Sequence, residues 1–76
     1  MTTVEIEYCV PCGFLRRAED VLHVLLATFG ERLDRVALVT GDHGVFVVRV
    51  DGEVVFDVSE DDFDADEIAR RVRSRM

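Results

Sequence analysis

The chain has 76 residues, 49% of them hydrophobic, and a formal net charge of −7. This length predicts one domain, residues 1–76, with a thin core, and the apolar content excludes a disordered chain. All nine basic residues are arginine, against sixteen carboxylates, so the chain lacks the basic stripe that nucleic acids and anionic membranes require.

The first predicted element is a strand from Thr3 to Tyr8, in which apolar and polar residues alternate. The alternation breaks at the segment Cys9-Val10-Pro11-Cys12-Gly13. A helix from roughly Cys12 to Phe29 follows, because apolar residues recur at steps of three and four along it. Gly30 stands where helices commonly end.

Three more β-rich runs follow the helix, at residues 35–40, 45–50 and 53–58. The order strand, helix, strand predicts a parallel pair with a right-handed crossover. Asp51-Gly52 between the last two runs predicts a hairpin. The chain then predicts a second helix, with Asp64 as its cap, Glu67 three residues later and arginines near its end. The order is βαβββα: a small mixed four-stranded sheet with two helices, of the α/β (α+β) class.

Cys9 and Cys12 carry the chemistry that the sequence suggests. Two intervening residues let the sulfurs meet in a disulfide, and the predicted helix start would stabilise a thiolate, which is the form that attacks disulfides. Three interpretations stay open: a redox-active pair, two buried cysteines that only pack, or a metal site. The redox interpretation is favoured, since a structural zinc site usually takes four ligands. We therefore expect no metal and no organic cofactor.

Three further residues are candidates for supporting roles. Pro11 would stiffen the turn between the cysteines by fixing one φ angle. Arg16, four residues after Cys12, would add positive charge one helical turn from the sulfur. His43 lies in a loop that the predicted topology brings near the cysteines, where it could exchange a proton with a thiol; a solvated loop histidine between two glycines is the favoured interpretation.

The compartment and the surface charge give further expectations. No apolar run approaches the length of a membrane span, and the first residues do not resemble a signal peptide, so we expect a cytoplasmic protein. The excess of acid together with the absence of lysine fits a high-salt cytoplasm. The alternative is a genome rich in G and C, which favours arginine codons. The high-salt interpretation is favoured because the excess of acid and the absence of lysine occur together.

The chain resembles the selenoprotein W-like (Rdx) family over nearly its whole length, and three segments carry the resemblance. They are Val4-Glu5-Ile6-Glu7-Tyr8-Cys9-Val10-Pro11-Cys12-Gly13-Phe14, Gly41-Asp42-His43-Gly44-Val45-Phe46-Val47-Val48 and Val50-Asp51-Gly52-Glu53-Val54-Val55-Phe56. The resemblance implies a thioredoxin-like fold and a redox role. In selenium-containing members the reactive atom is the selenocysteine at the second motif position, which is Cys12 here. In thioredoxins the first cysteine of the motif attacks, which would be Cys9 here.

The resulting hypothesis is a thiol–disulfide redox protein that exchanges disulfides with a protein or a small thiol. The alternative is an interaction module in which the pair is a redox-sensitive switch or is inert. The sequence leaves open which cysteine attacks, and it leaves the oligomeric state open, with a monomer as the default expectation.

The charge balance generates a first testable prediction. Mutual repulsion of sixteen carboxylates is screened by salt, so the folded state should gain stability between low and molar potassium chloride. A gain of about 1 kcal/mol would raise the melting temperature by roughly 4–8 °C in a domain of this size. The same titration at about pH 4, where carboxylates begin to protonate, should show a smaller effect. Equal melting temperatures in low and high salt would contradict the halophilic interpretation.

Overall fold

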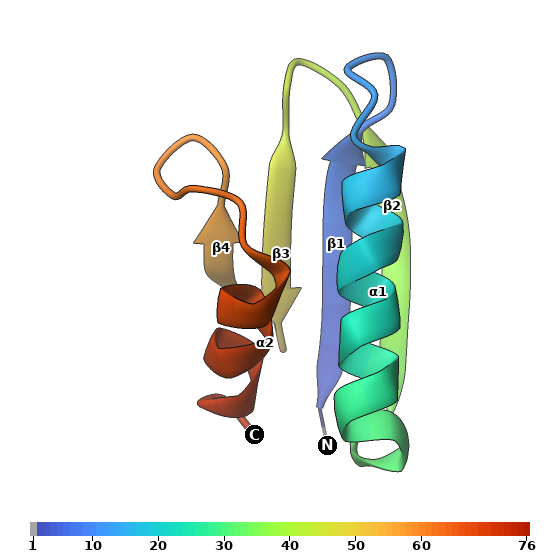
Figure 1. Ribbon diagram of the computed structural model, residues 1–76, viewed down its shortest axis with the longest axis vertical. Helices are drawn as coiled ribbons and strands as arrows, with labels where there is room; N and C mark the ends of the chain where they lie inside the picture. Colours follow the sequence, from blue (N-terminus) through green and yellow to red (C-terminus); the bar gives the residue numbers. More distant parts are fainter. Residues whose placement is uncertain (1) are drawn as a thin grey trace.

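The computed structural model describes residues 2–76, which form four strands and two helices in the order βαβββα (Figure 1). Their bounds are β1 Thr3–Cys9, α1 Leu15–Phe29, β2 Arg35–Gly41, β3 Phe46–Val50, β4 Glu53–Asp57 and α2 Ala65–Arg73, with a 3₁₀ turn, η1, at Gly30–Arg32. None of the helices formed by residues 2–76 has the length and apolar content needed to cross a bilayer.

The four strands form one mixed sheet in the order β2-β1-β3-β4. β1 pairs in parallel with β2 along its whole length, from Thr3 opposite Arg35 to Cys9 opposite Gly41. Its other edge pairs antiparallel with β3, which in turn pairs antiparallel with β4. The predicted parallel pair and the predicted hairpin are therefore confirmed, and the fold is a thioredoxin-like α/β fold.

The core lies between the sheet and the two helices, both of which cover the same face (Figure 1). Alternate residues of β1 point toward the helices, and these are the buried ones: Val4, Ile6 and Tyr8. They pack with apolar residues of the other elements: Phe46, Val48, Val50, Phe56, Ala18, Val21, Leu25, Phe29, Ile68, Ala69 and Val72. Cys9 and Val47 are also buried but do not belong to this cluster. Strand alternation places them on the other face, which we call the helix-free face.

The predicted start of α1 is wrong by three residues, because the helix begins at Leu15 and not near Cys12. Residues 10–13 form a turn instead, closed by a hydrogen bond from the Gly13 N–H to the Val10 carbonyl (3.2 Å). Gly13 has a φ of +78°, which lies outside the right-handed helical region and which side-chain-bearing residues rarely adopt. This glycine therefore separates Cys12 from the helix.

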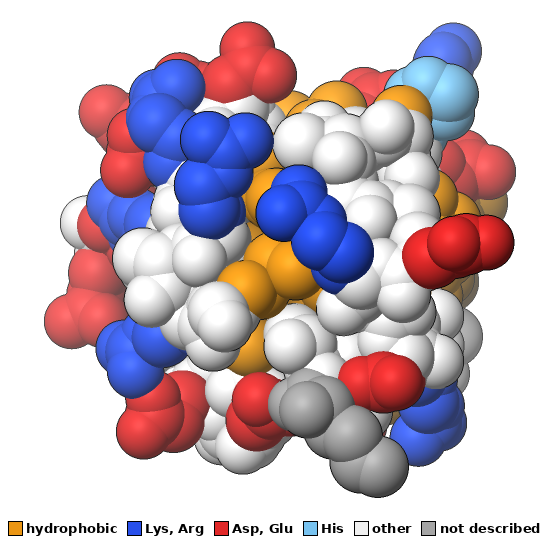
Figure 2. Space-filling model, turned by 90° about the horizontal axis from the view of Figure 1, so that it is seen from below, with side chains coloured by type: hydrophobic (Ala, Val, Ile, Leu, Met, Phe, Trp, Pro, Cys, Tyr) orange, Lys and Arg blue, Asp and Glu red, His pale blue; other side chains and the backbone are white. Residues whose placement is uncertain are grey.

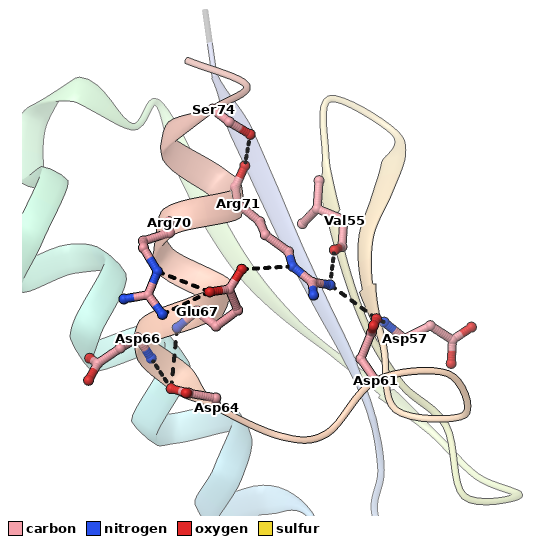
Figure 3. Close-up of polar contacts among 9 residues, drawn as sticks. All are labelled: Val55, Asp57, Asp61, Asp64, Asp66, Glu67, Arg70, Arg71 and Ser74. Carbon is pink, nitrogen blue, oxygen red and sulfur yellow. Dashed lines mark hydrogen bonds and ion pairs between the residues drawn. The ribbon is translucent and has the colours of Figure 1, made fainter.

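The last helix begins as predicted. The Asp64 carboxylate accepts hydrogen bonds from the N–H groups of Asp66 and Glu67, at 3.0 and 3.3 Å (Figure 3). Glu67 itself accepts hydrogen bonds from the arginines at positions 70 and 71, so its carboxylate serves the later turn rather than the cap. At the end of the molecule where both termini lie, arginines and carboxylates are interspersed on the surface (Figure 2).

Arg71 ties α2 to the sheet. Its guanidinium donates to the carboxylates of Asp61 and Glu67 and also to the carbonyl of Val55 on the edge strand β4 (Figure 3). The hydrogen bond from Arg71, and then that from the Asp57 N–H, holds the pKa of Asp61 below its ordinary value of 3.8. Hydrogen bonds from Arg70 and then Arg71 lower the pKa of Glu67 from its ordinary 4.5.

These two lowered pKa values predict a loss of stability in acid. A carboxyl group with a lower pKa in the folded state stabilises the fold fully above its unfolded pKa, and that contribution disappears as the pH falls through the folded value. The relevant window therefore lies below pH 4.5 for Glu67 and below 3.8 for Asp61. The free energy of unfolding, measured by urea denaturation, should therefore fall less between pH 7 and about pH 3 in Arg71→Met than in the wild type.

Arg16→Met is the matched control, because it removes the same charge from the exposed start of α1. Its stability should fall with acid as steeply as that of the wild type. If Arg71→Met and Arg16→Met have the same pH dependence, the Arg71 network does not contribute the acid sensitivity.

Candidate active site

The two cysteines lie at the end of β1 and in the turn that follows it, at the end of the molecule away from both termini (Figure 1). They are joined by a disulfide, with Cα atoms 5.3 Å apart. The predicted proximity of the pair is therefore present in the fold. Among residues 2–76, no group of three or more His, Cys, Asp or Glu side chains is placed to hold a metal ion.

Backbone hydrogen bonds attach the end of β1 and the start of the cysteine turn to the end of β2 and the loop that follows it. The Cys9 N–H donates to the Val45 carbonyl at 2.7 Å, and the Val10 N–H donates to the Gly41 carbonyl at 3.1 Å. The Phe14 N–H then donates to the Cys9 carbonyl at 3.4 Å, just before α1 begins. Both the N–H and the carbonyl of Cys9 therefore take part in backbone hydrogen bonds.

The two cysteines differ in exposure. Cys9 is 0% exposed, whereas Cys12 lies in the exposed part of the turn. Two apolar side chains next to the turn are also open to solvent, Val10 at 50% and Leu15 at 46%. Cys12 is therefore the more accessible of the two cysteines, and it lies within a partly apolar surface.

Two of the predicted supporting residues lie near the pair. Pro11 is exposed in the turn between the cysteines. Arg16 is exposed in the first turn of α1, and the placement one helical turn after Cys12 is wrong because Cys12 lies outside the helix. Arg16 instead lines a shallow hollow on the outer side of α1, with residues that include Glu19, His23 and Leu26. The functional roles of Pro11 and Arg16 stay predictions.

The loop that carries His43 does border the cysteine turn, as the hydrogen bond from the Cys9 N–H to its Val45 carbonyl requires. The imidazole itself lies away from the protein, with the side chain 90% exposed and Nδ1 2.5 Å from the Asp42 carboxylate. His43 also has a φ of +60°. This placement is that of the solvated loop histidine, and a proton-transfer role for it stays a prediction.

The aromatic residues beside the turn fix the start of α1. Phe14 packs edge-on against Phe46 at 5.9 Å, and Phe46 packs in the same way against Phe63 at 5.6 Å. The Arg17 guanidinium lies 5.3 Å from the Phe14 ring and 5.2 Å from the Phe63 ring. Such cation–π contacts stabilise by about 0.5–1 kcal/mol at exposed sites. The segment directly after Cys12 is therefore anchored on the core.

A charged pair that the sequence analysis did not single out lies on the helix-free face near Cys9. Glu7 accepts a hydrogen bond from Arg49 at 3.1 Å, with both side chains about 30% exposed. Glu7 is two residues before Cys9 on β1, so both side chains leave the strand on the same face. The alternation of Glu5, Glu7 and Cys9 in the predicted strand was the signal that would have found this neighbourhood.

The chain is similar to solved structures over almost its whole length, among them the following two. A protein from Bordetella parapertussis is 36% identical, with a TM-score of 0.91, and the match covers 99% of this chain and 98% of that one. A selenoprotein W-related protein from Vibrio cholerae is 28% identical, with a TM-score of 0.89 over 97% of this chain and 95% of that one. A comparison with curated proteins finds no match.

The family comparison covers almost the whole chain. The model of the Rdx family matches residues 3–74, which include β1, the cysteine turn and all later elements. With a Cys9–Cys12 pair at the end of β1 and a thioredoxin-like fold, the chain belongs to the Rdx family.

Proposed function

We propose that the protein is a thiol–disulfide redox protein in which the exposed Cys12 attacks and the buried Cys9 resolves. The observation that carries this proposal is the disulfide-linked pair at a strand end, with one cysteine open to solvent and the other enclosed. An attacking sulfur must reach a partner, and only Cys12 is placed to do so. The order is the reverse of that in thioredoxins, and it agrees with the position that holds selenocysteine in selenium-containing relatives.

The exchange takes place in two steps. The Cys12 thiolate attacks one sulfur of a partner disulfide, and the other partner sulfur leaves as a thiolate. The Cys9 thiol then loses its proton and attacks Cys12, forming the Cys9–Cys12 disulfide and releasing the second partner sulfur. Two electrons pass from the two cysteines to the partner disulfide. A second thiol system of the cell would reduce the protein again.

The surroundings of Cys12 indicate the class of partner. The exposed apolar side chains of Val10 and Leu15 suit a protein surface or a small thiol with an apolar part. A pair that cycles between thiol and disulfide suits a reducing compartment, which agrees with the cytoplasmic location expected from the sequence. The positive end of α1 begins three residues after Cys12, so its effect on the thiolate is weaker than a cysteine inside the first turn would experience.

The first experiment on this proposal is a redox titration. The protein is equilibrated with mixtures of oxidised and reduced dithiothreitol, and free thiols are counted by mass spectrometry after alkylation. We expect a reversible disulfide within one chain, with a potential between about −120 and −270 mV, the range of known oxidoreductases. Two thiols that never pair within a chain would contradict the proposal.

A turnover assay separates this function from a redox-sensitive binding module. Reduction of a model disulfide by the protein with an external reductant should continue over many cycles, and either Cys9→Ser or Cys12→Ser should abolish it. Redox-dependent capture of a partner without turnover would favour the binding module.

The difference in exposure yields a separate prediction about the single variants. Cys9→Ser keeps the exposed thiol and should form a mixed disulfide with oxidised glutathione. Cys12→Ser keeps only the enclosed thiol, which should react more slowly by about tenfold or more, because thiol reactivity depends on access. Intact mass spectra at timed intervals measure both rates.

The unfolded variants serve as the control for this comparison. In denaturant the two thiols should react at rates that agree within about threefold, because the protein no longer encloses either one. Faster reaction of the folded Cys12→Ser variant would show that Cys9 attacks.

A further inference from the structure

The buried resolving cysteine leaves one chemical requirement unmet. After Cys12 has formed the mixed disulfide, the Cys9 thiol must give up a proton before its sulfur attacks. In the disulfide form Cys9 is 0% exposed, so its surroundings on the sheet give bulk water no direct access to it in that form. His43 does not meet the need, since its side chain is 90% exposed and its ring contacts Asp42. The proton acceptor has to lie on the helix-free face, where strand alternation places Cys9.

Glu7 is the carboxylate that approaches this position. It leaves β1 on the same face as Cys9, two residues earlier, and its side chain extends toward the C-terminal end of the strand. This direction follows from how closely the side chain approaches the position of a Cβ at Gly41, the residue paired with Cys9 on β2. A Cβ built on Gly41 would lie 3.1 Å from Glu7 Oε2 and 3.4 Å from Glu7 Cγ. Neighbouring strands are about 4.8 Å apart, so this carboxylate oxygen lies beside the backbone position opposite Cys9.

The glycine at position 41 is explained by this approach. Gly41 does not adopt a positive φ, so backbone conformation does not require a glycine there. A Cβ would collide with Val45 Cγ1 at 2.8 Å and would press on the Glu7 carboxylate. The missing side chain leaves room for Val45 and the Glu7 carboxylate to share the space next to Cys9.

Arg49 holds Glu7 in this orientation through one oxygen and leaves the other free for Cys9. Its guanidinium donates to Oε1, whereas Oε2 is the oxygen near Gly41. The register places further charged groups on the same face: Glu5 on β1, Arg35 on β2 and Asp57 on β4, with Asp42 and His43 in the adjoining loop. Of these carboxylates, Glu7 is the nearest to Cys9 along β1.

We propose that Glu7 accepts the proton of the Cys9 thiol during the resolving step. The inference rests on the proposed function, because it assumes that Cys9 attacks the Cys12 mixed disulfide. The proton moves from Cys9 Sγ to the Glu7 carboxylate, the Cys9–Cys12 bond forms, and the partner sulfur leaves as a thiolate. Glu7 then returns the proton to the leaving thiolate or to water, and the two electrons have passed to the partner.

The test separates the two steps with dithiobis(nitrobenzoate), an aryl disulfide that releases one coloured thiolate each time a protein sulfur attacks. In stopped flow the reduced protein should give a first phase from Cys12 and a second phase from Cys9. Glu7→Gln should slow the second phase by about tenfold or more at about pH 6 and leave the first phase within about twofold, since a positioned base contributes at least that much. The difference in second-phase rate between Glu7→Gln and the wild type should narrow toward about pH 9, where hydroxide replaces the carboxylate as base.

Glu5→Gln is the matched control. It removes the same charge from the same strand and face, two residues further from Cys9, opposite Arg49 in the register. Its second phase should match the wild type at every pH. Glu7→Asp keeps the negative charge beside Arg49 with a shorter reach, and its second phase should be intermediate between those of the wild type and Glu7→Gln.

The wild type supplies a test that does not depend on a folded variant. With Glu7 as base, its second phase should change little between about pH 8 and pH 6, whereas dependence on hydroxide would slow it about tenfold per pH unit. A hydroxide-dependent wild type, or a Glu7→Gln variant that matches Glu5→Gln, overturns the role of Glu7 and leaves the exchange function in place. A wild type that releases no second coloured thiolate and forms no internal disulfide overturns both.

Discussion

The structure depends on the pairing of β1, the central strand, with β2 on one side and β3 on the other. This strand has two different faces because its side chains alternate. Val4, Ile6 and Tyr8 fill the core under the helices, whereas Glu5, Glu7 and Cys9 leave on the other side. The parallel register with β2 ends with Cys9 opposite Gly41, so the same pairing that builds the sheet also sets the position of Cys9.

This division gives the two cysteines different surroundings. Cys9 is fixed within the sheet by pairing and by the hydrogen bond from its N–H to Val45. Cys12 lies outside both the strand and the helix, in a turn that Gly13 closes. A sulfur that must meet a partner benefits from the exposed turn, and a sulfur that must meet only Cys12 benefits from a fixed place. The aromatic contacts of Phe14 hold the far side of the turn against the core.

Much of this arrangement is readable from the sequence, because it depends on local patterns. Alternation in residues 3–8, the helical spacing up to Phe29, the Asp51-Gly52 turn and the Asp64 cap each identify an element, and all four are present. The start of α1 was misplaced because the apolar spacing begins at Leu15, while Cys12 and Gly13 carry no signal that periodicity can use. A positive φ at Gly13 is a property of the closed turn, not of the pattern around it.

The approach of Glu7 to Gly41 shows where sequence reasoning stops. Alternation places Glu7 and Cys9 on one face, but it does not tell which way the glutamate side chain turns along the strand. That direction is seen only in the space that Gly41 leaves on β2, and the carboxylate is held there by Arg49 from a strand more than 40 residues later in the chain. Both are consequences of register between strands. The role that we propose for Glu7 draws on three strands at once and therefore needs the assembled sheet, even though each of its residues is plain in the sequence.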